Sequence, residues 1–150
     1  IRSGNWYGND TAWRMILDLN KILFYANPDG SLREDNLIKA KHYIGIVDAI
    51  IAGEGNGPLE PDPLSMNCII SGTNPVAIDA VAAHLMGFDP LKIPAIRNAF
   101  SIKKFRLCDF EYKDINIQYN WREYNMSSLP GDLIVPCRAH FGWKGHIETN

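Results

Sequence analysis

The sequence lacks an excess of charge of either sign. Its 15 Lys and Arg residues and 17 Asp and Glu residues leave a formal net charge of −2, and its densest basic patch is the short segment 103–106. Proteins that bind mainly nucleic acid or anionic membranes gather Lys and Arg on one face or in long runs. We therefore expect neither nucleic acid nor a membrane as the main partner.

A long hydrophobic run is also absent. The longest apolar run, 76–86, is interrupted by Asp79 and His84. It is shorter than the roughly 20 apolar residues that cross a bilayer as a helix. Hydrophobic residues make up 46% of the 150 residues, which suffices for one domain with its own core. We therefore expect residues 1–150 to form a single water-soluble domain.

Closely spaced cysteines are missing as well. Cys68, Cys108 and Cys137 are odd in number and far apart, and no Cys-x-x-Cys pair occurs. Zinc ribbons and iron–sulfur clusters need closer sets of thiolates, so we expect no iron–sulfur cluster from this chain alone. Unpaired thiols fit a reducing compartment, which favours a cytoplasmic location.

What the sequence does contain is a series of periodic apolar segments, some with helical spacing and some rich in β-branched residues. In chain order the expected elements are a helix over 12–24, a buried strand over 43–51, a buried strand over 66–70, a buried helix over 75–86, a short helix over 94–100, a half-exposed strand over 114–119 and an extended tail over 133–147 that packs on the body. These elements predict an α/β domain, with a mixed or parallel sheet of about four strands covered by helices.

The segment between the two buried strands is rich in glycine and proline. Glycines let the backbone approach a ligand and direct its N–H groups inward, as in sites for phosphate or carboxylate. The segment is neither a P-loop nor a dinucleotide fingerprint, because no Gly-Lys-Ser/Thr follows and prolines rather than a helix come next. We expect no regular structure over 53–63, and a ligand-binding loop and a tight turn are equally good interpretations. The candidate binding residues of the loop are Gly53, Glu54, Gly55, Asn56 and Gly57.

Carboxylates gather around the same loop. Asp48 and Glu54 carry oxygens that suit a hard divalent cation, with Asn56 as a further ligand, although the spacing does not match an EF-hand. The simpler alternative is that Glu54 bonds to loop amides, while Glu60 and Asp62 are solvated between prolines.

Asp79 is the most informative single residue, because an unpaired buried carboxylate in an apolar helix is costly. It should meet a donor, a cation or a ligand, and the backbone N–H groups of a nearby loop are the more common donors. The same helix begins after Asn74, where free amides and the helix dipole favour an anion.

The direction of the two buried strands decides whether these candidates form one site. If the strands are parallel, the glycine loop and Asn74 lie at the same end of the sheet, where α/β folds bind ligands. If they are antiparallel, the two features lie at opposite ends. The connection of about a dozen residues is near the minimum for a parallel crossover, so both arrangements stay open.

A second polar loop precedes the first helix. Its candidate site residues are Asn5, Asn9 and Asp10, with simple helix capping as the alternative. The 4 histidines offer no metal-binding pair at a spacing of four residues, and no catalytic triad can be assigned.

Three motifs of the sequence are similar to those of a known family. They are the segment SGNWYGNDT over 3–11, the segment IVDAII followed by GEGNGP over 46–58, and NPVAID over 74–79. Together with the ending GWKGH over 142–146, they resemble the domain-of-unknown-function family 362, whose members are often labelled iron–sulfur centre proteins. The resemblance implies that this chain, which begins without Met, is the C-terminal half of a larger family domain whose first half is absent. It implies no particular activity.

Three functional hypotheses follow. The first is a small-molecule or metal-assisted site that uses Asp48, Glu54, Asn56 and Asp79. The second is a structural or interaction module that docks to a redox partner or to the missing N-terminal half. Exposed aromatics around Trp143 and in 1–8 would favour it, and a large apolar patch on the isolated domain would discriminate it from the first. The third is electron transfer through an iron–sulfur cluster, which needs cysteines outside this chain.

Overall fold

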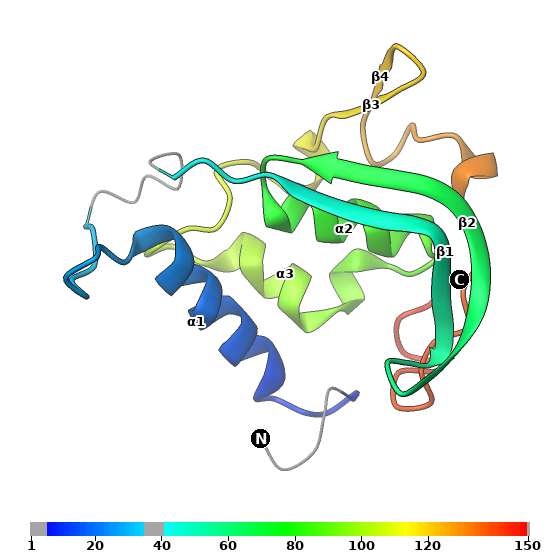
Figure 1. The fold of residues 1–150 in the computed structure, drawn as a ribbon, viewed down its shortest axis with the longest axis horizontal. Coiled ribbons are helices and arrows are strands. Elements are labelled where there is room, and N and C mark those ends of the chain that lie inside the picture. The colour runs from blue at the N-terminus through cyan, green and yellow to red at the C-terminus, as the bar shows by residue number, and fades with distance from the viewer. Residues whose placement is uncertain (1–5, 35–40, 150) are drawn as a thin grey trace.

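The computed structural model describes residues 6–34 and 41–149. The helices lie together, and a bent β-hairpin runs along one side of them (Figure 1). The described elements are α1 (Ala12–Tyr25), β1 (Gly45–Asn56), β2 (Glu60–Gly72), α2 (Pro75–Leu85), η2 (Pro90–Lys92), α3 (Pro94–Ser101), η3 (Tyr112–Asp114), β3 (Ile117–Tyr119), β4 (Arg122–Tyr124) and η4 (Gly131–Leu133). The predicted mixture of helices and strands is confirmed.

α1 forms where the helical spacing of apolar residues predicts it. Its inner face buries Leu17, Phe24 and Tyr25 against other segments, among them Leu107. The Tyr25 hydroxyl donates a hydrogen bond of 2.6 Å to the backbone oxygen of Arg106, so the polar end of this buried side chain is satisfied. This packing fixes α1 to a segment more than 80 residues away in the sequence.

β1 and β2 form one antiparallel hairpin that starts with the pair Gly45 and Gly72. The register shifts between Ala49 and Ile51. One residue separates these two in β1, whereas two residues separate their partners Cys68 and Ser65 in β2. The extra residue lies near Asn67, which has a φ of 53°, a left-handed conformation that its short polar side chain tolerates. A bulge of this kind bends a strand, and the hairpin bends strongly (Figure 1).

The predicted sheet is wrong in strand direction and in size. The described residues contain two separate two-stranded antiparallel sheets, β1–β2 and β3–β4, and not one mixed or parallel sheet of about four strands. β1 and β2 extend toward each other beyond the predicted strands, so that only residues 57–59 lie between them. Such a short turn joins antiparallel strands, because parallel strands need a crossover of about a dozen residues or more.

Glycine and proline do not prevent strand pairing over 53–63, contrary to the prediction. Gly53 pairs with Pro63, and Gly55 pairs with Pro61. Proline is tolerated in a strand at the edge of a sheet, and β2 is such a strand. Glycine fits closely here, because a Cβ on Gly53 would lie only 2.8 Å from the Cβ of Pro61.

α2 packs against the inner face of the hairpin. Gly45 and Gly72 leave room for Ile78, since a Cβ on Gly45 would lie 2.6 Å from Ile78 Cδ1 and a Cβ on Gly72 would lie 3.0 Å from Ile78 Cγ1. The predicted buried helix is confirmed, with the exception of Asp79, which is exposed. The buried side chains of α2 are Val76, Ile78, Ala80, Val81, Ala83 and Leu85.

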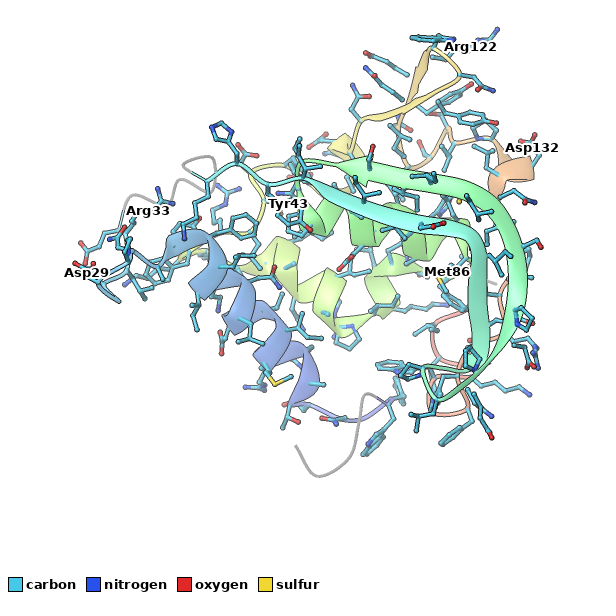
Figure 2. All side chains as sticks on the ribbon, in the orientation of Figure 1. Asp29, Arg33, Tyr43, Met86, Arg122 and Asp132 are labelled. Atoms are coloured by element: carbon cyan, nitrogen blue, oxygen red, sulfur yellow. The ribbon has the colours of Figure 1, made fainter. Side chains whose placement is uncertain are left out.

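The tail packs on the segment that follows α2, as predicted. The backbone N–H groups of Val135 and Cys137 donate to the carbonyl oxygens of Leu85 and Met86 at 2.8 and 2.9 Å. Met86 therefore marks the place where the tail meets the body (Figure 2). The buried apolar side chains of this region are Phe88, Cys137, Trp143 and Ile147.

The predicted strand over 114–119 is reduced to β3, which pairs with β4 in a short hairpin. Arg122 lies at the outer end of this hairpin, which projects from the body (Figure 2).

Candidate functional site

The predicted site residues lie at opposite ends of the β1–β2 hairpin. The glycine loop is at the end with the short turn, whereas Asn74 follows Gly72 at the other end. Because the strands are antiparallel, the loop and the beginning of α2 do not form a common site. Of the two arrangements that the sequence leaves open, the antiparallel one is correct.

Glu54 and Asp62 are held by Arg138 of the tail, and we call these three residues the Arg138 clamp. One carboxylate oxygen of Glu54 accepts a hydrogen bond of 2.7 Å from the backbone N–H of Arg138, and the other accepts one of 2.8 Å from Arg138 Nε. Arg138 Nη2 pairs with Asp62, which lies opposite Glu54 in the hairpin register. Both Glu54 oxygens are therefore occupied, in agreement with the simpler alternative that Glu54 bonds to backbone amides.

The glycines of the loop have structural reasons to be there. Gly55 has a φ of 73°, which favours glycine, and its N–H donates to the backbone oxygen of Arg138 at 2.9 Å. The tail thus runs along the outer edge of β1 at this point. Asn56 and Gly57 lie at the turn, and Asn56 is exposed.

Replacing Glu54 by Gln is expected to loosen the tail without unfolding the domain. Gln keeps the size of the side chain but removes the charge that strengthens its bonds to Arg138. The amide of Gly55 should then exchange its hydrogen about tenfold faster, while the amides of α2 stay unchanged, as measured by hydrogen exchange with mass spectrometry. Unchanged exchange at Gly55 would contradict the clamp, and Glu60→Gln, an exposed acid in the same hairpin, is the control.

The clamp also predicts a dependence on pH. Hydrogen bonds from the backbone N–H and then from the side chain of Arg138 lower the pKa of Glu54. Because the lowered pKa belongs to the folded state, the stabilisation is present at neutral pH and is lost as the pH falls through that value. The Gln variant should lack this acid-dependent loosening of the tail.

Asn74 caps α2 with its own side chain. Its Oδ1 accepts hydrogen bonds from the N–H groups of Val76 at 2.9 Å and Ala77 at 3.2 Å, and its Nδ2 donates to the backbone oxygen of Leu107 at 2.8 Å. Two of the free amides that could hold an anion are therefore satisfied within the chain. The sequence signal of Asn followed by Pro predicts this cap correctly.

Replacing Asn74 by Ala should lower the free energy of unfolding by roughly 2–3 kcal/mol, from loss of the cap and of the bond to Leu107. Asn74→Asp is the matched control, because it keeps a capping oxygen but replaces the amide donor to Leu107 by a charged acceptor. Urea unfolding should therefore place the Asp variant between the wild type and the Ala variant. Equal stability of Ala and wild type would contradict the structural role of the cap.

Asp48 and Asp79 are both exposed. Asp48 Oδ1 accepts a hydrogen bond of 3.1 Å from the N–H of Ile50. Desolvation by neighbouring atoms raises the pKa of Asp79, an effect that solvent weakens at an exposed position. The expectation of a buried Asp79 that must find a donor is wrong, because this side of α2 faces away from the core.

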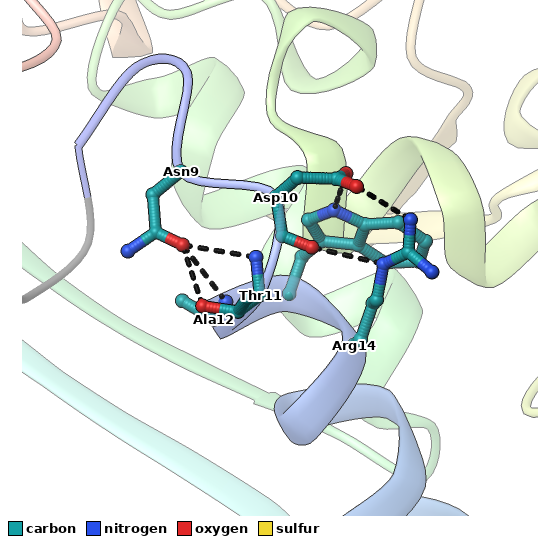
Figure 3. Close-up of polar contacts among 6 residues, drawn as sticks. Asn9, Asp10, Thr11, Ala12 and Arg14 are labelled. Atoms are coloured by element: carbon teal, nitrogen blue, oxygen red, sulfur yellow. Dashed lines mark hydrogen bonds and ion pairs between the residues drawn. The ribbon is translucent and has the colours of Figure 1, made fainter. Parts of the chain in front are cut away.

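Asn9 and Asp10 cap and brace the beginning of α1 (Figure 3). Asn9 Oδ1 accepts from the backbone N–H and the hydroxyl of Thr11 at 2.9 and 2.7 Å. The carboxylate of Asp10 accepts from Trp13 Nε1 at 2.9 Å and from Arg14 Nη2 at 2.5 Å, and these bonds lower its pKa. Asn9, which accepts from backbone N–H groups, has the capping role given as the alternative, whereas the Asp10 carboxylate binds only side chains. Asn5 lies outside the described residues.

The largest feature that the sequence prediction missed is an exposed apolar face of the hairpin, which we call the isoleucine face. β1 was expected to be buried on both faces, but α2 packs only on the inner side of the hairpin, and Ile51 of β1 is also 70% exposed. Asp48 lies opposite Ile69 in the register, so the isoleucine face contains one carboxylate among its apolar side chains. The alternating isoleucines of 44–50 are the sequence signal that could have identified this face. The members and their exposed fractions are Ile44 (74%), Ile46 (70%), Ile50 (48%) and Ile69 (62%).

α1 carries a second exposed apolar stripe. Its four residues follow one another at intervals of four, three and one positions, which places them on one side of the helix. This side lies away from the face that buries Leu17 and Phe24. A surface helix ordinarily presents polar side chains there. The stripe consists of Met15, Leu19, Ile22 and Leu23.

The sequence matches a known family over the part that contains these features. The family described as "Domain of unknown function (DUF362)" matches residues 4–84, which is more than half of the chain. The chain belongs to the DUF362 family. The matched range includes α1, β1, β2 and all but the last residue of α2, and therefore the entire isoleucine face. The ending over 142–146 lies outside the matched range.

A curated relative of this DUF362 chain is a thylakoid-associated protein of Synechocystis sp. (strain ATCC 27184 / PCC 6803 / Kazusa). The two are 34% identical over 53 residues, a segment that is 35% of this chain and 16% of the relative. No solved structure matches the chain significantly. Among the described residues, no helix is both long enough and apolar enough to span a membrane.

Proposed function

We propose that this DUF362 chain is a structural docking module, and that another part of the same family domain, the expected N-terminal half, covers its isoleucine face. The observation that carries the proposal is the exposure of Ile44, Ile46, Ile50 and Ile69 on one face of a hairpin. Contiguous apolar patches on soluble proteins mark interaction sites.

The energetic reason is the free energy that burial of this face would release. Fully burying one isoleucine side chain is worth about 1.5–3 kcal/mol, so four such side chains represent a gain on the order of 5–10 kcal/mol. Sequences that expose this much apolar surface in water are prone to association. A covering segment from the same domain would satisfy the face without self-association, and the aligned relative extends far beyond the segment it shares with this chain.

The small-molecule or metal-assisted hypothesis has weaker support. Glu54 is engaged by Arg138 and Asn74 caps its own helix, so neither is available without breaking these contacts. In the described ranges, His, Cys, Asp and Glu side chains form no group of three that could hold a metal ion. These contacts and this absence among the described residues give the metal-assisted hypothesis less support than the docking proposal.

Side-chain footprinting by carbene labelling tests the proposal. The isolated chain and the full-length protein that carries it are labelled under identical conditions, and peptides are quantified by mass spectrometry. We expect labelling of Ile46 and Ile69 to fall at least several-fold in the full-length protein. Leu59, which is 92% exposed at the hairpin turn and outside the isoleucine face, is the internal control.

Equal labelling of Ile46 and Ile69 in both proteins would overturn the proposal. A fall at these residues with no change at Leu59 would support it, because general shielding by a larger protein would affect all three positions.

A further inference from the structure

We infer that the covering segment adds a β-strand to the open edge of β1. This inference rests on the proposed docking function and specifies how docking occurs: through backbone hydrogen bonds along Gly45–Ala52, together with the isoleucine face. Strand addition of this kind is a common way for a sheet edge to bind an extended segment.

The first argument is the unpaired edge itself. Apart from its pairing with β2, β1 makes only one backbone–backbone hydrogen bond within the described ranges, from Gly55 to Arg138. The backbone of Gly45–Ala52 on that side has no backbone partner among the described residues. An exposed, apolar edge strand is a ready template for another strand. The open segment is long enough for a typical strand of about five or six residues.

The second argument is the contrast between the two edges of the hairpin. β2 carries Pro61 and Pro63 and the bulge near Asn67, all of which are features that prevent strands from adding to an edge. β1 has no proline and exposes isoleucines along the open part. The edge of β1 is therefore the one suited to a partner.

The third argument is that the tail already uses this edge. The backbone oxygen of Arg138 accepts from Gly55, and the Arg138 clamp fixes the tail beside the last residues of β1. The open segment Gly45–Ala52 continues directly from this contact. The Arg138 clamp thus sets one limit of the space for an added strand.

Asp48 indicates the chemistry of the added strand. It lies within the open segment among isoleucines, so an added strand with alternating apolar residues and a Lys or Arg near Asp48 would match it in both burial and charge. A second copy of this chain matches poorly. Antiparallel self-pairing centred on this segment would place two Asp48 carboxylates opposite or diagonally beside each other, and like charges across strands are destabilising.

Hydrogen exchange resolved at single amides tests this mode of docking in the full-length protein and in the isolated chain. Backbone groups of an extended strand point alternately to its two sides. An added strand should therefore slow exchange by about 100-fold at every second residue of the open segment. The affected amides should be in phase with Gly55, which already faces this edge; they are those of Gly45, Val47, Ala49 and Ile51.

The outcomes separate this inference from the docking proposal. Slow alternate amides together with shielded Ile46 and Ile69 would support both. If carbene labelling of the isoleucines falls but the amide exchange rates of β1 stay unchanged, strand addition is overturned and docking is not. The same holds if exchange slows along β2 instead of β1. Unchanged amides and unchanged labelling would overturn both. If the isolated chain forms a dimer in which the same alternate amides of β1 exchange slowly, the added strand comes from a second copy. That result would overturn the assignment of the partner to another part of the family domain.

Discussion

Replacing Tyr25 by Ala is expected to remove a large part of the stability of the chain. Tyr25 has an exposed fraction of 0% and packs in the cluster that joins α1 to α2 and to Leu107. Its ring lies 5.2 Å from that of Phe105, and the Arg33 guanidinium lies 5.5 Å from the ring centroid. Truncating a buried aromatic side chain costs about 3–5 kcal/mol, against a total stability of about 5–15 kcal/mol for a typical domain.

Tyr25→Phe separates packing from hydrogen bonding. It keeps the ring and removes only the hydroxyl that donates to Arg106, for an expected loss of about 1–2 kcal/mol. Urea unfolding followed by circular dichroism should therefore rank wild type above Phe and Phe well above Ala. A loss below about 1 kcal/mol for the Ala variant would show that α1 is not held by this contact.

The helices could be predicted from the sequence because their signals are local. The spacing of apolar residues places α1, and Asn74 followed by Pro75 places the beginning of α2. A capping side chain and the amides it satisfies are two or three residues apart. Such short-range patterns are visible without knowledge of the rest of the fold.

The pairing of the strands could not be predicted in the same way. Alternation and β-branched residues indicate a strand but say nothing about its partner or direction. Here the glycines and prolines over 53–63 suggest an end to regular structure, whereas Gly53 and Gly55 pair with Pro63 and Pro61. A long loop was therefore predicted where the strands come within a short turn of each other, and the turn length is what decides an antiparallel hairpin.

The contacts of the candidate site residues could not be predicted for a related reason. Glu54 lies in β1 and not in the predicted loop, and its partner Arg138 is 84 residues further along the chain. No local pattern connects them. Asp48 and Asp79 were located correctly in their elements, but which side of each element faces the solvent depends on neighbours that the sequence does not reveal.

For the isoleucine face, too, the local sequence indicates the strand but not the segment that packs against it. The apolar character of 43–51 correctly indicates a strand that gains free energy from burial. It does not indicate which segment provides the cover, and the described residues cover only one of its two faces. The difference between the predicted and the observed burial of β1 is the observation on which the docking proposal rests.

Ile46→Lys is expected to change the stability of the full-length protein far more than that of the isolated chain. Ile46 is 70% exposed, so the isolated chain should change in unfolding free energy by less than about 0.5 kcal/mol. In the full-length protein, the same substitution removes the gain from burying isoleucine and places an ammonium group under the covering segment. We expect a loss of about 3 kcal/mol or more there.

Leu59→Lys is the control, because Leu59 is an exposed apolar residue of the same hairpin that lies at the turn. It should leave both forms nearly unchanged, so the diagnostic quantity is the difference between full-length protein and isolated chain for each variant. An effect of the substitution within the isolated chain is present in both forms and cancels when the two changes in unfolding free energy are subtracted. The difference therefore reports only the burial that the full-length protein adds to the hairpin. Equal, small effects of Ile46→Lys in both forms would mean that the isoleucine face remains open, which would overturn the docking proposal.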